Sequence, residues 1–206
     1  MDNKAYLDEI AVKGKRKGAD GPPLSPAIIK LIIVAVFAVI SLAIVGSIIS
    51  NKNTANTQLY EKVYSRVAAF ADKKGPFAKY QNYINSSSLR ALNISVRSSL
   101  ETTRSTLASA ASGVKIDTKS ISAEVKKDES GITSLFTSKL DEARLLGELD
   151  STFATEASYQ LTMLISLEQE ALAKVTDINF ANALSASIED LTLLRDNYND
   201  WSPTGE

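Results

Sequence analysis

The chain of 206 residues contains no cysteine and no histidine. These absences exclude disulfides, thiol nucleophiles and imidazole acid–base catalysis, together with ordinary zinc and haem sites. The sequence also lacks a glycine-rich phosphate loop, a Gly-x-Ser-x-Gly motif and an EF-hand loop. We therefore expect a protein that is not an enzyme and that holds no cofactor and no metal.

Charge is absent from one long stretch, residues 31–50, which is almost entirely apolar. Twenty helical residues rise about 1.5 Å each and span roughly 30 Å, the thickness of the hydrocarbon core of a bilayer. A core helix of a soluble protein would carry a polar stripe, and this run has none. The pattern predicts a transmembrane helix over residues 26–50, with Ser25 as its N-cap and Pro26 in its first turn. Its predicted membrane-spanning positions include Leu31, Phe37, Ile40, Gly46 and Ile49.

Basic residues are more frequent before this run than directly after it. Six lie before it, whereas only Lys52, Lys62 and Arg66 lie in the first residues that follow. Because lysine and arginine mark the cytoplasmic side, we expect the N-terminus inside and the C-terminal body outside the cytoplasmic membrane. A cleaved signal peptide is the alternative, but the run is too long for one and Ile44-Val-Gly46 is a poor cleavage site. An uncleaved signal anchor is the better interpretation.

The N-terminal head, residues 1–25, is too short and too polar to form a core. It contains the basic cluster Lys13-Gly-Lys-Arg-Lys17 and a Gly/Pro-rich stretch. We expect this head to be disordered and cytoplasmic, because it cannot bury enough apolar area to offset its ordering entropy. The basic cluster either sets the topology alone or also binds anionic lipid headgroups.

Residues 51–200 show helical periodicity throughout, with breaks at Gly75-Pro76, Gly113, Gly147 and Thr176-Asp177. Gly113 is expected to end a long helix as its C′ residue. At Gly131, either one helix passes through the glycine or a short helix stops there and Ser130 caps the next. The predicted fold class is all-α, with the single N-terminal transmembrane helix followed by an extracytoplasmic antiparallel bundle of four to five helices. The last residues, 201–206, are expected to form a frayed tail.

The clearest apolar stripe runs from Phe153 to Val175. Glu156, Glu168 and Glu170 lie on the same predicted helix, where solvated charge is expected. An enzyme acting on the cell wall through two carboxylates would need two acids facing each other in a pocket, so we consider it the least favoured function.

Charge is distributed unevenly along the body. From Lys52 to Lys127 there are thirteen basic and five acidic residues, and from Asp141 to Glu206 there are three basic and thirteen acidic. Packing of the early helices against the late ones would make these surfaces complementary. The alternative is a charged face that binds a partner.

Three aromatic residues are candidates for interaction. Tyr60 and Tyr64, one turn apart near the predicted membrane surface, would form an interfacial aromatic belt or else pack against a second helix. Trp201 would be an anchor in an exposed tail or would cover the end of the bundle. Asn85-Ser-Ser87 and Asn93-Ile-Ser95 match the N-glycosylation sequon, a weak signal in a chain rich in serine and threonine.

The layout is similar to that of the LemA-type proteins: a short N-terminal segment, one membrane helix and then an external helical bundle. The likeness covers the layout alone, so no functional residue is carried over. Two hypotheses remain. The first is a membrane-anchored bundle with a structural or protein-interaction role, whose partners are the lipid bilayer and another protein or a second copy of the chain, with no nucleic acid. The second is a sensory bundle that binds a ligand between helices and signals through a continuous membrane helix to a separate output subunit.

Overall fold

The computed structural model describes residues 52–202, and side chains from residue 56 onward. This range is helical and contains no strand, which confirms the all-α prediction. Five of its helices are long, and two short elements connect them. The order is α3 (Lys52–Ala71), α4 (Pro76–Lys79), α5 (Ser87–Ala110), the 3-10 helix η2 (Ala111–Val114), α6 (Ala123–Leu146), α7 (Leu149–Leu172) and α8 (Ile178–Asp200).

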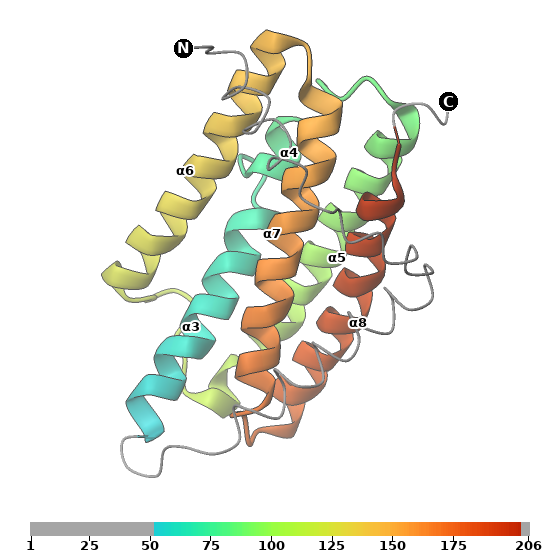
Figure 1. Cartoon of the computed structure of the whole chain (residues 1–206). Coiled ribbons are helices and arrows are strands. Elements are labelled where there is room, and N and C mark those ends of the chain that lie inside the picture. The colour runs from blue at the N-terminus through green and yellow to red at the C-terminus, as the bar shows by residue number, and fades with distance from the viewer. Residues whose placement is uncertain (1–51, 203–206) are drawn as a thin grey trace, which may run out of the picture. The chain divides into compact units, whose positions relative to one another are not determined.

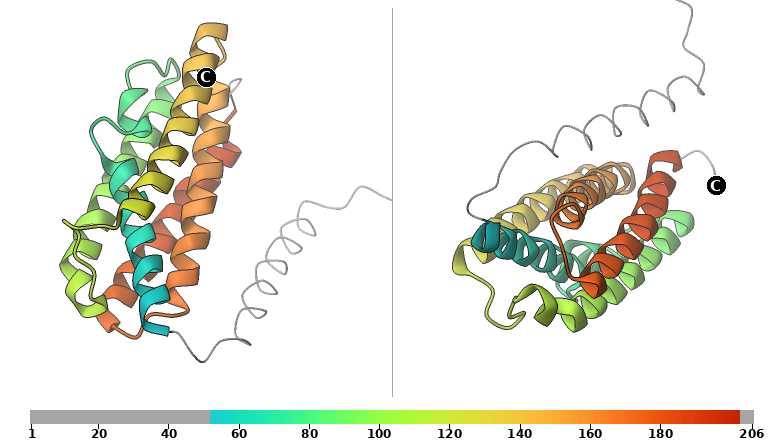
Figure 2. Two further views of the ribbon diagram at one scale, coloured as in Figure 1. Left: turned by 90° about the vertical axis from the view of Figure 1, so that its left-hand side faces the viewer. Right: turned by 90° about the horizontal axis from the view of Figure 1, so that it is seen from below.

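Successive long helices run in alternating directions along one bundle (Figure 1). The pairs α3–α5, α5–α8 and α7–α8 lie in contact, and the two helices of each pair are antiparallel (Figure 1). Helix α6 lies on the outside of this group, against α3 and α7 (Figure 2). It runs parallel to α3, because residue 62 of α3 contacts residue 128 of α6 and residue 79, beyond α3, contacts residue 141.

Most of the predicted helix ends are confirmed. Helix α3 stops before Gly75, and Pro76 occupies the first turn of α4, where its missing N–H is not needed. Gly147 ends α6 with a left-handed φ of 76°. Asp177 begins α8 by accepting a 2.8 Å hydrogen bond from the backbone N–H of Phe180.

The prediction for Gly113 is wrong. Helix α5 ends at Ala110 and continues into η2, and the left-handed residue that closes this segment is Lys115, with a φ of 60°. Gly113 serves a different purpose, because a Cβ at this position would lie 2.2 Å from Oδ2 of Asp177. A close approach to the cap of α8 therefore requires glycine here. Gly131, in contrast, lies inside an unbroken α6.

The core is centred on α7 and on a cluster of four phenylalanines. Phe77 contacts Phe70, Phe136 and Phe153 with ring-centroid distances of 5.5, 5.5 and 6.1 Å, in edge-to-face arrangements. All four rings are fully buried. Such pairs stabilise by about 0.5–1.5 kcal/mol beyond the burial of their area. The cluster joins α3, α4, α6 and α7 at one level of the bundle.

None of the helices within residues 52–202 combines the length and apolarity needed to cross a bilayer. The predicted transmembrane helix with Leu31, Phe37, Ile40, Gly46 and Ile49, the predicted head and residues 203–206 lie outside the described residues. The junction between residues 26–50 and α3, whose continuity the sensory hypothesis requires, lies there too.

Candidate functional site: a groove between two helices and two buried carboxyl groups

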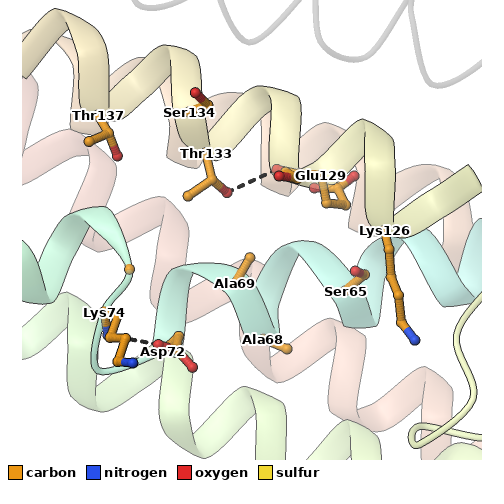
Figure 3. Close-up of a pocket in the computed structure, with 12 residues that line it drawn as sticks. Ser65, Ala68, Ala69, Asp72, Lys74, Lys126, Glu129, Thr133, Ser134 and Thr137 are labelled. Carbon is orange, nitrogen blue, oxygen red and sulfur yellow. Dashed lines mark hydrogen bonds between the residues drawn. The ribbon is translucent and has the colours of Figure 1, made fainter. Parts of the chain in front are cut away.

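An open groove of about 610 Å³ lies between α3 and α6 (Figure 3). Small side chains line it from both helices, and Ala69 of α3 and Thr133 of α6 point toward each other across it. The groove exists because the facing surfaces carry alanine, serine and threonine where the core faces carry valine and phenylalanine. Its lining comprises Ser65, Ala68, Ala69, Asp72, Lys74, Gly75, Lys126, Glu129, Ser130, Thr133, Ser134 and Thr137.

Polar contacts hold α6 beside α3 along this groove. Arg66 makes a buried ion pair with Glu129, in which Nη2 donates to Oε1 at 2.9 Å and Nε donates to Oε2. An exposed pair, Lys62 with Asp128 at 3.9 Å, lies nearby. A bidentate arginine–carboxylate pair combines charge with fixed geometry. The groove is therefore bordered by a rigid, neutralised pair rather than by a free carboxylate.

The far end of α6 is held by two further contacts. Nζ of Lys79 lies 2.9 Å from Oδ2 of Asp141, and this hydrogen bond holds the pKa of the Asp141 carboxyl below its ordinary value. The Tyr80 hydroxyl donates to the carbonyl oxygen of Thr137 at 2.8 Å, and burial raises the pKa of this phenol. Among the described residues, Lys79 is the early basic residue whose ion pair reaches the segment from Asp141 onward, whereas Lys62 and Arg66 pair with Asp128 and Glu129.

A second buried carboxyl group lies in the centre of the bundle. Glu168 of α7 is fully buried, and its Oε1 accepts a 2.8 Å hydrogen bond from Ser187 of α8. The Thr103 hydroxyl of α5 lies 3.2 Å from that of Ser187. Desolvation by burial raises the pKa of Glu168 to about 8, against a smaller lowering by the Ser187 hydrogen bond. Glu168 is therefore a neutral acid at pH 7, joining three helices.

The prediction that Glu168 is solvated is wrong. Its position follows Leu161 by seven residues and Leu164 by four, so the helical period places it on the core face. Glu129 follows Val125 by four and precedes Phe136 by seven, and it is buried for the same reason. This phase relation was the signal that sequence reasoning missed.

The three predicted interaction residues differ in their surroundings. Tyr60 is buried, with its ring 5.4 Å from that of Phe180 in α8. Tyr64 is half-buried and lines a shallow hollow of about 430 Å³ between α3 and α5, next to Arg104. Trp201 is half-buried against the core, and its indole N–H donates to Ser88 Oγ at 3.1 Å. Trp201 thus covers the end of the bundle at the start of α5.

The two sequons differ in accessibility. Asn93 is fully buried, and its amide donates to the Phe77 carbonyl at 2.9 Å and to Oε1 of Gln81 at 2.5 Å. Asn85 is exposed at the turn before α5. Only Asn85 is an accessible acceptor in the folded bundle.

The described residues gather no group of three or more metal-ligating side chains. In the same range, the two most buried carboxyl groups belong to separate clusters, one paired with arginine and the other neutral. The groove offers hydroxyl groups, methyl groups, two lysines, Asp72 and the paired carboxylate of Glu129.

No family model, no curated protein and no solved structure matches this chain. The similarity of layout to the LemA-type proteins therefore stays a prediction from the sequence.

Proposed function

We propose that this protein is a membrane-anchored helical bundle whose body lies outside the cytoplasm and binds another protein or a second copy of itself. The observation that carries the proposal is the uncharged run of residues 31–50, which stands directly before a bundle beginning at Lys52. A run of this length and composition matches the hydrocarbon core of a bilayer. The anchor would hold the bundle, whose described part lacks a catalytic constellation, at the membrane surface.

The surface of α6 and α7 supports an interaction role. Lys139 of α6 and Glu156 of α7 form a 2.6 Å ion pair, which sets the register of this antiparallel helix pair. Leu135 lies one turn before Lys139, and Tyr159 and Met163 lie one and two turns after Glu156. These three large apolar side chains are exposed. Their spacing places them on neighbouring turns of the same seam, which we take as the interaction face.

The topology can be tested with single cysteines, because the chain has none of its own. We expect a membrane-impermeant maleimide added to intact cells to label Ser120→Cys in the exposed loop before α6, and not Lys17→Cys in the head. Labelling of Lys17→Cys alone would reverse the orientation, and recovery of Ser120→Cys from the medium without residues 1–50 would contradict the anchor.

The interaction face can be tested by replacing Tyr159 with a photo-crosslinking amino acid in the full-length protein in its membrane. We expect a discrete crosslinked product, identified by mass spectrometry as a second copy or as one recurring partner. The same substitution at Asn182, which is exposed on α8, is the matched control. Equal products from both positions, or none from Tyr159, would contradict the assignment of this face.

The groove between α3 and α6 supports a second candidate, a sensory bundle that binds a small ligand. Ala69→Phe would fill the groove from α3. If the groove binds a metabolite, one member of a metabolite panel should raise the unfolding temperature of the wild-type protein and leave the variant unchanged. A panel without any shift, or a shift shared by both proteins, would exclude the groove as the binding site.

A further inference from the structure

Helix α7 contacts α3, α6 and α8, and it leaves one stripe of its surface exposed. The exposed residues follow one another at intervals of three or four and therefore share one face of the helix. They are Ser151, Thr155, Tyr159, Met163 and Ser166, and we call these five residues the α7 face. Its two large side chains, Tyr159 and Met163, leave 53% and 44% of their surface exposed.

The α7 face carries no charge. The single charged residue between Ser151 and Ser166 is Glu156, and Lys139 of α6 pairs with it at 2.6 Å. The exposed residues of α8 are acidic by comparison and include Glu189, Asp190, Asp196 and Asp200. In a two-fold dimer the same surface of both copies meets, so a face of one charge would oppose its own charge. The α7 face can therefore meet a copy of itself without repulsion, whereas the acidic face of α8 cannot.

The hydroxyl groups of the α7 face are already hydrogen-bonded within the helix. Thr155 donates to the carbonyl oxygen of Ser151 at 3.0 Å, and Ser166 donates to that of Thr162 at 3.0 Å. Ser151 donates to the carbonyl oxygen of Glu148 at 3.1 Å. Covering a hydroxyl group usually costs free energy, because its donor loses water and finds no acceptor. Here each donor keeps its acceptor, so a partner can cover these hydroxyl groups without leaving a donor unpaired.

We infer that the α7 face binds the α7 face of a second copy of the chain, with Tyr159 near the two-fold axis. This inference deepens the proposed interaction role of the α6–α7 surface and rests on it. Tyr159 is the middle residue of the stripe, so its ring meets its own copy whether the two helices run parallel or antiparallel. Tyrosine and methionine are enriched in protein interfaces, and residues spaced by four form the ridge that packs into a second helix.

The test uses the full-length protein in its membrane, with single cysteines and a flexible bismaleimide crosslinker. Thr155→Cys lies on the α7 face. Thr102→Cys on the exposed side of α5 is the matched control, because Thr102 also donates to a carbonyl oxygen four residues earlier at 3.0 Å. Copies held face to face have a high effective concentration, so we expect at least about fivefold more crosslinked dimer from Thr155→Cys than from the control. Equal amounts of dimer would overturn the inference.

Opposite charges test whether Tyr159 meets its own copy. Tyr159→Glu and Tyr159→Lys each place like charges at the axis, so either variant alone should lose most of the Thr155→Cys dimer. Co-expression of the two variants under different tags should restore the crosslink between the tags. Because Tyr159 is exposed, circular dichroism should report unchanged helicity. Dimer that survives in the single variants, or that does not return on co-expression, would overturn the inference.

Failure of this inference is distinct from failure of the proposed function. A Thr155→Cys product that contains one other protein, and no second copy, would overturn the inference and leave the interaction role intact. The absence of any crosslinked product from both Thr155→Cys and the photo-crosslinking residue at position 159 would contradict the interaction role as well.

Discussion

The seam between α3 and α6 and the centre of α7 each bury a glutamate, and the two glutamates have different hydrogen-bond and charge partners. Glu129, 3% exposed, forms an ion pair with Arg66 and lies beside a groove lined by small side chains. Glu168, 0% exposed, has no cation within ion-pair distance among the described residues, and burial keeps it protonated while its Oε1 accepts a hydrogen bond from Ser187. The first region is joined by charge and the second by apolar packing.

This difference indicates that α7 is packed into the bundle more stably than α6. Helix α7 buries residues on three sides, including Phe153, Leu161 and Leu164. Helix α6 buries fewer, and much of its contact with α3 is polar. Ion pairs contribute less net stability than apolar burial, because ions lose hydration on burial. We therefore expect α6 to be the helix that most readily separates from the others, and the one whose attachment responds to changes of charge.

The largest expected effect is the pH dependence that arises from Glu168. Its pKa is raised to about 8 in the folded state, so between pH 4.5 and 8 the folded protein holds a proton that the unfolded chain has lost. Stability is therefore full below about pH 4.5 and falls as pH rises to 8, by roughly 4–5 kcal/mol. Urea unfolding across this range should show the loss in the wild-type protein and not in Glu168→Gln. Glu170→Gln, on the exposed side of α7, is the control and should behave like the wild type.

The ion pair of the α3–α6 seam should give the next largest effect. Arg66→Met or Glu129→Met alone leaves an uncompensated buried charge and should cost about 3–5 kcal/mol of unfolding free energy. The double variant removes both charges and should lie within about 1 kcal/mol of the wild type. Lys62→Met breaks an exposed pair and should cost well under 1 kcal/mol. If chemical denaturation shows that the double variant loses the sum of the two single losses in unfolding free energy, the ion pair does not hold α6 beside α3.

Replacing either of two glycines by alanine should change the stability by a smaller amount, and the two changes should have opposite signs. Gly131 lies exposed inside α6 with nothing within 4 Å of an added Cβ, so Gly131→Ala should stabilise by about 1 kcal/mol. Gly113→Ala would press against the Asp177 carboxylate and disturb the cap of α8, so it should destabilise by about 1 kcal/mol or more. Thermal unfolding of the two variants distinguishes them, and equal shifts would show that Asp177 moves aside freely.

The smallest effect is expected at Lys115. Glycine adopts its left-handed conformation without steric cost, so Lys115→Gly should stabilise the loop before α6 by about 0.5 kcal/mol. Thermal unfolding of the variant and of the wild type measures this gain, and an unfolding temperature that is unchanged or lower would contradict it.

The helical periods of this sequence predict the described elements well, because each helix carries an apolar stripe and most of its ends have a local cause. Pro76, Gly147 and Asp177 each act through backbone geometry or a hydrogen bond within a few residues. The predicted end of α5 at Gly113 is wrong because this glycine makes room for Asp177, which lies 64 positions later in the chain. Contacts of that range leave no periodic signal.

The sequence by itself determined that residues 52–202 are helical and where most of the helices begin and end, since both depend on local periodicity and capping. The tertiary structure alone decided that α6 runs parallel to α3, that Arg66 meets Glu129, and that Glu168 meets a serine and not a cation. The physical reason is that the charge and pKa of a buried group depend on the side chains that other helices bring beside it, and the spacing along one helix does not specify these neighbours.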